Sequence, residues 1–250
     1  MRLALTKYGW PEVVIFPAIV LGTMIVCFVV GVLYLSVQAI ISAETVLAVI
    51  LIWVLSFFRD PYRLCPKEAN LLLSPADGEV ADIKIVEEND FIGEHAIRVG
   101  IFLSIFDVHI NRAPCNVKVE RISYKKGKYK NASSPESGRV NESNDLCIIR
   151  TDSPKDRLIV RQISGAIARR IVCAAREGQE LTGGEKFGMI KFGSRTELYV
   201  PARANIKCLV QTGDKVKAGV TPLVRYEGTL LGGEGRGTRD EGRRTKLCPG

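Results

Sequence analysis

The hydrophobic and polar positions divide the chain into an apolar N-terminal part and a longer part of short runs. Residues 13–35 contain no charged side chain, and a second apolar run covers 45–58. About 20 helical residues are needed to cross a bilayer, so the first run is long enough. The second is a short span, a re-entrant segment or an interfacial helix. Together they predict a helical membrane hairpin within residues 1–60.

Positive charges indicate how this hairpin is oriented. Arg2 and Lys7 precede the first run. Arg59 and Arg63 follow the second, whereas residues 36–44 contain neither Lys nor Arg. The positive-inside rule therefore predicts a cell-membrane protein with both ends of the hairpin, and the domain that follows, in the cytoplasm. The alternatives are a buried hairpin of a soluble protein and a cleaved signal peptide, for which the first run is too long.

After residue 60 the pattern changes to short runs rich in Val and Ile, separated by Gly, Pro, Asn or Asp. This predicts a mainly β domain, a compact sandwich or barrel, over 61–226. Segments 178–184 and 213–219 both begin and end with glycine and have an apolar fourth residue. They resemble the hairpins of lipoyl- and biotinyl-type folds, and we interpret them as an architectural repeat. Residues 227–250 contain seven glycines and predict a flexible tail.

The composition agrees with a basic globular domain on an apolar anchor. Of the 250 residues, 46% are hydrophobic and 25% charged, which excludes a disordered or collagen-like chain. Residues 1–60 have no net charge, so the rest carries the whole +8, from 32 basic and 24 acidic side chains. The basic run 118–130, with Tyr124 and Tyr129, is either a solvated β-hairpin or a surface for anionic lipid headgroups. Nucleic acid is not an expected partner of an anchored protein.

The cysteines and histidines restrict the chemistry. Seven cysteines are scattered without a C-x-x-C pair, and their number is odd. This argues against a disulfide framework and a structural zinc site, and fits a reducing compartment. His95 and His109 are the only histidines. A metallohydrolase with two or three histidine ligands is hard to build from them, so no metal is expected.

Three separate segments of the β domain carry Asp77, His109 and Ser194. Taken singly, each is ordinary: a turn before a strand, a histidine at a strand end and a Gly-Ser dipeptide. Together they permit a Ser–His–Asp arrangement, with a histidine suited to proton transfer near neutral pH. No G-x-S-x-G elbow is present, which speaks against an α/β-hydrolase. The residues permit a serine nucleophile and do not by themselves identify its target.

Four stretches together resemble the phosphatidylserine decarboxylase family, and most closely its short, second type. They are FFRDPYR (57–63), SPADGEV (74–80), FLSIFDVHINRAP (102–114) and FGMIKFGSRTELYVP (187–201). The stretch with Phe-Gly-Ser-Arg is the most specific. The resemblance runs from the membrane segment to about residue 226, so the tail lies outside it.

The resemblance implies a precursor that cleaves itself between Gly193 and Ser194 into a large and a small chain. Ser194 would attack the carbonyl of Gly193 and become a pyruvoyl group, with His109 as the base. Asp77 would orient the imidazole. The pyruvoyl group accepts the electron pair released as CO₂ leaves phosphatidylserine, which gives phosphatidylethanolamine without a metal. Arg112 stands where longer members carry a second histidine, and we expect it to hold the substrate phosphate or carboxylate.

The expected partners are phosphatidylserine, an anionic membrane surface and the two chains of one precursor, and a homodimer is left open. A related ether phospholipid is an alternative substrate. A non-catalytic, membrane-anchored β module is a second hypothesis, and it predicts an intact 193–194 bond. A serine hydrolase is a third, and it predicts that a fluorophosphonate labels Ser194.

Overall fold

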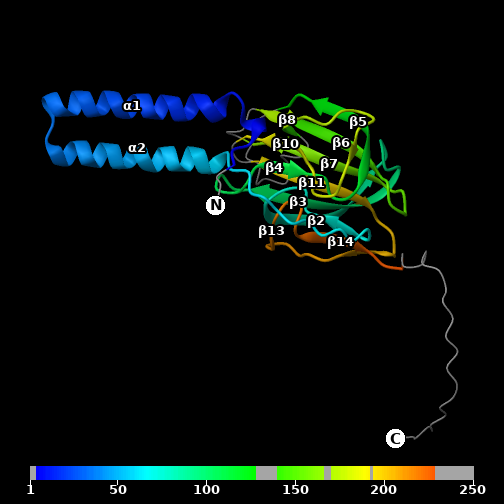
Figure 1. Cartoon of the computed structure of the whole chain (residues 1–250). Helices are drawn as coiled ribbons and strands as arrows, with labels where there is room; N and C mark the ends of the chain where they lie inside the picture. Colours follow the sequence, from blue (N-terminus) through cyan, green and yellow to red (C-terminus); the bar gives the residue numbers. More distant parts are fainter. Residues whose placement is uncertain (1–3, 128–139, 166–169, 192–193, 229–250) are drawn as a thin grey trace, which may run out of the picture.

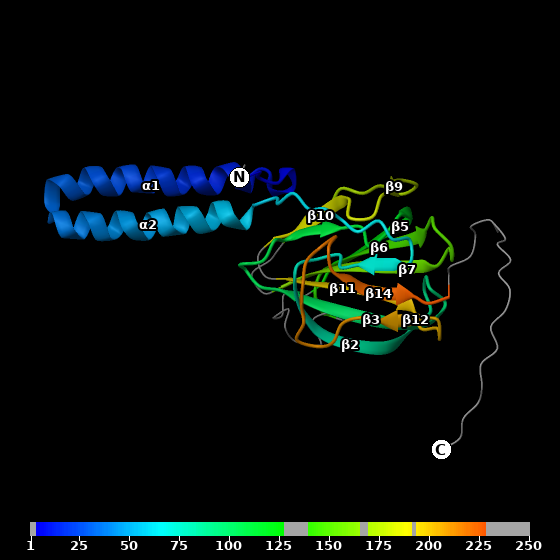
Figure 2. The same ribbon diagram turned by 60° about the horizontal axis from the view of Figure 1, so that its bottom comes forward.

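The computed structural model describes residues 4–127, 140–165, 170–191 and 194–228 and shows two long helices projecting from a β domain (Figure 1). Most of the predicted tail lies outside these ranges. The helices α1 (Glu12–Tyr34) and α2 (Val37–Phe57) lie side by side in both views (Figures 1 and 2). Both are long and apolar enough to cross a membrane. They confirm the predicted pair of apolar N-terminal helices, which associates the protein with a membrane.

The second helix begins eight residues earlier than the apolar run 45–58 predicts. Ser36 caps it by accepting a backbone N–H of the first turn at 3.4 Å. The hydroxyls of Ser42 and Thr45 donate to backbone carbonyls four residues earlier, at 2.9 and 2.7 Å. Because these polar groups are satisfied within the helix, residues 37–44 before the predicted run also become helical. With 21 residues, α2 reaches the length of a membrane span.

The β domain follows a short 3-10 helix, η1 (Lys7–Gly9), and the helical pair. The described residues form fourteen strands, which are β1 (Leu71–Leu73), β2 (Gly78–Glu88), β3 (Glu94–Leu103), β4 (Ile110–Arg112), β5 (Val117–Lys125), β6 (Ser143–Arg150), β7 (Arg157–Ser164), β8 (Ile171–Cys173), β9 (Glu180–Leu181), β10 (Lys186–Ile190), β11 (Ser194–Pro201), β12 (Ile206–Cys208), β13 (Lys215–Val216) and β14 (Pro222–Tyr226). The described part of the basic run 118–130 is mostly strand β5, paired with β6. Its contact with lipid headgroups stays a prediction.

The strands form one large curled sheet and two small ones, which confirms the mainly β fold (Figure 2). The large sheet has the order β13-β2-β3-β11-β7-β6-β5-β9, and the small sheets have the orders β1-β14-β12 and β4-β10-β8. The main core lies between them, where Leu198 of the large sheet packs in one cluster with Leu72 and Phe187 of the small sheets. Burial of this apolar area is the principal driving force for the fold.

The two glycine turns noted in the sequence form equivalent turns in the structure. Gly178, Gly184, Gly213 and Gly219 have φ angles of 80°, 80°, 96° and 69°, a region that favours glycine. The first turn contains β9 and the second contains β13, and these strands are the two edges of the large sheet. The repeat is therefore architectural, as predicted.

The same equivalence relates the starts of β2 and β5. Asp77 precedes β2, and its Oδ1 accepts the N–H of Ala218 in the second turn at 2.8 Å. Asn116 precedes β5, and its Oδ1 accepts the N–H of Gly183 in the first turn at 2.9 Å. The two glycine turns thus donate to side chains that differ in charge, a carboxylate in one case and an amide in the other.

Strand β11 runs through the centre of the large sheet, between β3 and β7, and all eight of its residues are buried. On the face opposite the main core, the Arg195 guanidinium donates to Glu197 at 2.8 Å and to Asp82 at 2.7 Å. It lies directly over Gly100, where a side chain would overlap it. Glycine at position 100 therefore makes room for a buried ion pair that fastens the start of β11.

We expect Gly100→Ala to destabilise the domain by about 3 kcal/mol, because the new methyl displaces a buried guanidinium from its carboxylates. The matched control is Gly93→Ala, where the methyl meets nothing within 4 Å and only the φ of +80° is unfavourable. That change should cost about 1 kcal/mol. Chemical unfolding followed by circular dichroism measures both values. Equal losses would contradict the importance of the space over Gly100.

Candidate active site

Ser194 is the first residue of β11 and lies opposite Leu103 of β3 and Ser164 of β7. It is fully buried, and its Oγ has no hydrogen-bond partner among the described residues. A buried hydroxyl without a partner is unfavourable for stability and points to a chemical role. Gly193, the other half of the predicted cleavage site, lies outside the described residues.

His109 belongs to a segment that meets the segment of Ser194, and two chain connections lead to this corner of the domain. Its carbonyl accepts the N–H of Ile190 at 3.2 Å, and Ile190 ends β10 only four residues before Ser194. From the other side, residues 104–109 connect Leu103, the cross-strand neighbour of Ser194, to His109. The structure therefore brings together two of the three predicted catalytic segments.

The His109 imidazole is buried, and one of its ring nitrogens is hydrogen-bonded to the main chain. Its Nδ1 lies 2.9 Å from the carbonyl oxygen of Asp107. A carbonyl only accepts, so Nδ1 donates the proton, and Nε2 is the basic nitrogen. Burial lowers the pKa of His109 to about 4; Arg59 also lowers it, while the Asp107 carbonyl and Asp77 oppose the shift. The ring of Phe57, 4.5 Å away between centroids, forms part of the apolar surroundings.

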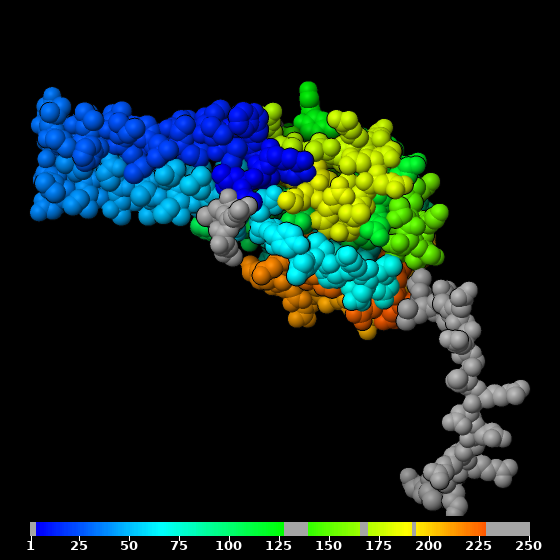
Figure 3. All heavy atoms as spheres, in the orientation of Figure 1, coloured from blue at the N-terminus to red at the C-terminus, as the bar shows by residue number. Residues whose placement is uncertain are grey.

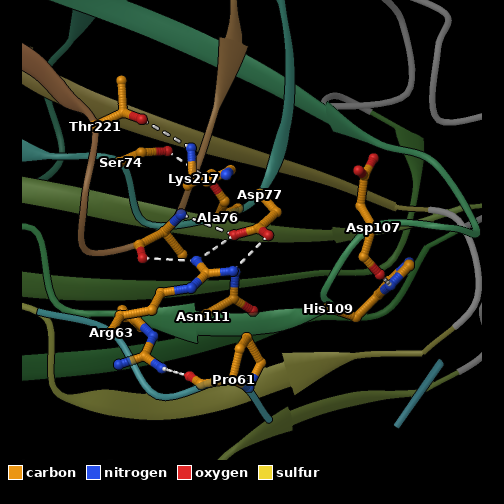
Figure 4. Close-up of polar contacts among 12 residues, drawn as sticks. Pro61, Arg63, Ser74, Ala76, Asp77, Asp107, His109, Asn111, Lys217 and Thr221 are labelled. Atoms are coloured by element: carbon orange, nitrogen blue, oxygen red, sulfur yellow. Dashed lines mark hydrogen bonds and ion pairs between the residues drawn. The ribbon is translucent and has the colours of Figure 1, made fainter. Parts of the chain in front are cut away.

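Asp77 makes a different contact from the one expected. Both of its carboxylate oxygens accept hydrogen bonds from the Arg63 guanidinium, at 2.5 and 2.6 Å (Figure 4). The Nδ1 of His109 donates its orienting hydrogen bond to the Asp107 carbonyl instead, as the same view shows. Asp77 is near enough to raise the pKa of His109 by its charge. Its catalytic role stays a prediction. Arg63, within FFRDPYR, is a site residue that the sequence analysis did not single out.

Arg112 is buried and bound to backbone carbonyls. Its guanidinium donates to Gly184 at 2.9 Å and to Pro61 at 3.2 Å, and lies 3.8 Å from Asp60. These contacts fasten the segment after α2 to one of the glycine turns. They give Arg112 a structural part, and its contact with substrate stays a prediction.

Asn111 connects the three segments that carry the predicted catalytic residues. Its amide nitrogen donates to the carbonyl of Pro75 at 3.4 Å and to the hydroxyl of Thr196 at 3.1 Å. Its amide oxygen accepts from Gln162 at 2.9 Å. Asn111 is fully buried. In the sequence, Asn111 is only an uncharged polar residue after Ile110. That pattern does not predict a contact between distant segments.

The base of the helical pair also contacts the chain that leads to Ser194. Lys191 is buried, and its Nζ lies 2.7 Å from a carboxylate oxygen of Glu12, the first residue of α1. Arg170 approaches the same carboxylate at 3.6 Å. Lys191 and Glu12 are 179 residues apart in the chain, so no local sequence pattern predicts their ion pair. Within the described part of the chain, no group of three or more His, Cys, Asp or Glu is arranged to hold a metal.

Sequence comparison supports the resemblance carried by these segments. A family profile described as phosphatidylserine decarboxylase matches residues 50–223. This chain belongs to the phosphatidylserine decarboxylase family. The matched region begins inside α2 and ends in β14, so it includes Asp77, His109 and Ser194.

Curated relatives named phosphatidylserine decarboxylase proenzyme cover most of the chain. The relative from Carboxydothermus hydrogenoformans is 42% identical over 177 residues, 71% of this chain and 81% of the relative. That from Symbiobacterium thermophilum is 39% identical over 224 residues, 90% of this chain and 96% of the relative. That from Rhodopirellula baltica is 45% identical over 171 residues, 68% of this chain and 70% of the relative. The assignment to the phosphatidylserine decarboxylase family is thus confirmed.

The buried neutral His109 should make stability depend on pH. Its pKa is about 4 in the folded protein and 6.5 ordinarily. Between these values the unfolded chain binds a proton that the folded chain does not, so stability falls as pH falls from 6.5 to 4, by about 3 kcal/mol. Above pH 6.5 this contribution is constant.

The check is chemical unfolding between pH 4 and 7.5. His109→Gln should remove most of this slope, whereas His95→Gln, at the exposed second histidine, should retain it. An unchanged slope in His109→Gln would show that other groups cause the pH dependence.

Proposed function

We propose that this chain is a membrane-anchored, self-cleaving phosphatidylserine decarboxylase that forms phosphatidylethanolamine and CO₂. In this proposal residues 1–60 are the anchor, 61–226 are the catalytic domain on the cytoplasmic face, and Ser194 becomes a pyruvoyl group. The observation that carries it is the buried hydroxyl of Ser194, which has no hydrogen-bond partner among the described residues and lies in a segment that meets that of buried His109, in a chain of this family.

The first reaction would cut the main chain. Nε2 of His109 takes the Ser194 hydroxyl proton as Oγ attacks the carbonyl carbon of Gly193, and the peptide C–N bond breaks to leave an ester. Loss of the Ser194 α-proton then expels the Gly193 carboxylate and leaves a dehydroalanine at position 194. Hydrolysis releases ammonia and leaves the ketone of the pyruvoyl group. The neutral state of His109 is the one that this base needs.

The residues around position 194 fit such a group. The Ser194 side chain is fully buried, and its Oγ has no hydrogen-bond partner among the described residues, so no contact of the fold depends on this hydroxyl. When present, the pyruvoyl group supplies an electron sink for the pair that CO₂ leaves behind. His109 would carry the proton at Nε2 and return it to the carbon that has lost CO₂. The Asp77 carboxylate raises the pKa of His109 by its charge, which favours the protonated imidazole in this step.

The large sheet explains how the two chains of one precursor would remain partners. Cleavage before Ser194 makes β11 the first strand of the small chain, and its neighbours β3 and β7 belong to the large chain. Strands β13 and β14, also in the small chain, pair with β2 and β1 of the large chain. Main-chain hydrogen bonds therefore connect the chains in two sheets.

The first prediction is that purified protein contains two chains that meet at 193/194. Intact mass and N-terminal sequencing should show a small chain that is blocked and lacks a serine amine, and the preparation should release CO₂ from phosphatidylserine. Ser194→Ala should remain one chain without activity, because it has no hydroxyl to attack with. An uncut wild-type chain would overturn the proposal. Fluorophosphonate labelling would then favour a hydrolase, and no labelling a non-catalytic module.

A second prediction separates the charge of Asp77 from its part in the turn. Asn116 shows that an amide accepts the turn N–H at the equivalent position, so Asp77→Asn should still form the turn, with a melting temperature lowered by the loss of the carboxylate that pairs with buried Arg63. Self-cleavage should nevertheless slow by about 10-fold or more, because the charge that favours protonated His109 is lost. Asn116→Ala disturbs the matching turn and should change the rate less than about 2-fold. Equal rates in Asp77→Asn and wild type would rule out a catalytic role for the charge.

A further inference from the structure

Several apolar side chains are exposed on the segments that join the helical pair to the β domain or contact its base. They belong to segments that enter, leave or contact the base of the helices, and they are Leu5 (42% exposed), Trp10 (67%), Tyr62 (88%), Leu64 (79%) and Phe106 (67%). Figure 3 shows the helices projecting from one side of the domain, with the segment after α2 (cyan) crossing its front. Phe106 differs from the others because it comes from the loop that ends at His109.

The 104–109 loop is held against the end of α2. Arg59, two residues beyond α2, donates to the Phe106 carbonyl at 2.6 Å and to the Ser56 carbonyl of α2 at 2.8 Å. The Asp107 carboxylate accepts the N–H of Ser104 at 2.8 Å and closes the loop. Val108 packs in one apolar cluster with Phe57. The backbone is thus anchored on both sides, while the Phe106 ring is exposed.

The lengths of the helices place this loop at the edge of a bilayer. At 1.5 Å per residue, the 23 residues of α1 span about 35 Å, and the hydrocarbon core is about 30 Å thick. A core that covers both helices therefore ends near Glu12 and Phe57. Trp10 lies just outside α1, and Phe106 is bound to Arg59 just outside α2. Both aromatic rings consequently lie at the level of the lipid headgroups.

We propose that the 104–109 loop is a bilayer-contact element, in which Phe106, together with Trp10, inserts into the headgroup–acyl boundary next to the catalytic corner. Aromatic side chains prefer this boundary, because one end of it is apolar and the other is wet. His109, three residues along the loop, is then buried just behind the lipid surface, so a lipid headgroup has only a short way to travel from the membrane to reach it. The inference rests on the membrane attachment and lipid substrate in the proposed function.

A bilayer fits this surface better than a second protein because the patch continues directly from two apolar helices. The same level also carries the basic side chains of Lys7, Arg59 and Arg170, of which Arg170 is 65% exposed. Anionic headgroups attract basic groups near a membrane surface. A second copy of the chain covering Phe106 is the competing arrangement, and the following experiment distinguishes it.

Depth in the bilayer can be measured directly on the full-length protein. In a Trp10→Phe/Trp53→Phe background, Phe106→Trp provides a single tryptophan at the loop. The matched control is Ile85→Trp, at a side chain 72% exposed that pairs with Ile97, six residues along β3 from Leu103. Proteins are reconstituted into phosphatidylcholine–phosphatidylglycerol vesicles with or without lipids brominated near the headgroup end of the acyl chain.

We expect brominated lipid to lower the fluorescence of the Phe106→Trp protein at least 2-fold and to leave that of the Ile85→Trp protein within about 10%. Unquenched fluorescence of vesicle-bound Phe106→Trp would overturn the bilayer contact, and if its emission also changed with protein density, the second copy would be favoured. Neither result depends on catalysis. A negative quenching result would therefore contradict the bilayer contact and would not contradict the proposed decarboxylase activity.

Kinetics give an independent second measurement. Phe106→Asp should raise the KM for vesicle-bound phosphatidylserine several-fold, because it places a carboxylate at an apolar, anionic boundary. Phe106→Leu should restore most of the wild-type KM, and Ile85→Asp should not change it. A Phe106→Asp protein with wild-type KM and a wild-type melting curve would contradict the proposal.

Discussion

The pairing of β11 with β3 and β7 is the constraint on which the rest of the structure depends. It places Ser194 opposite Leu103 and Ser164 with both faces of the sheet covered. Because β3 continues directly into the loop that ends at His109, the register of β11 on β3 also determines where the imidazole lies. Arg195 adds ion pairs at the start of the strand. Residue 194 is thereby held by contacts on three sides, and a break in the chain before it would leave all of them intact.

The catalytic corner is a local departure from an internal symmetry. The two glycine turns supply both edges of the large sheet, and each turn donates an N–H to a side chain at the start of the neighbouring strand. One half uses Asn116 for this purpose, which shows that the turn needs only an acceptor. The other half uses Asp77, whose charge is matched by Arg63. The carboxylate does more than the turn requires, because it pairs with buried Arg63 and its charge also raises the pKa of His109.

The helical pair is part of the site as well as an anchor. Phe57 and Phe58 at the end of α2 are buried in one cluster with Val108 and Met189 of the β domain. The Phe57 ring contacts the imidazole that the mechanism uses, and its apolar surface contributes to the burial that keeps His109 neutral. At the start of α1, Glu12 forms an ion pair with Lys191 ahead of Ser194. Membrane attachment and catalytic geometry therefore depend on the same few contacts.

The sequence by itself determined the apolar helical pair, the mainly β class, the glycine repeat and the family, because each of these appears in local patterns of length, period or motif. It also singled out His109 and Ser194, which the structure brings to one corner, whereas the catalytic roles remain predictions. Only the tertiary structure decided that Asp77 pairs with Arg63 and that Asn111 connects three segments. Those features depend on which distant residues meet and how deeply they are buried. Local periodicity carries no information about such contacts, and the neutral charge state of His109 is a property of its surroundings rather than of its residue type.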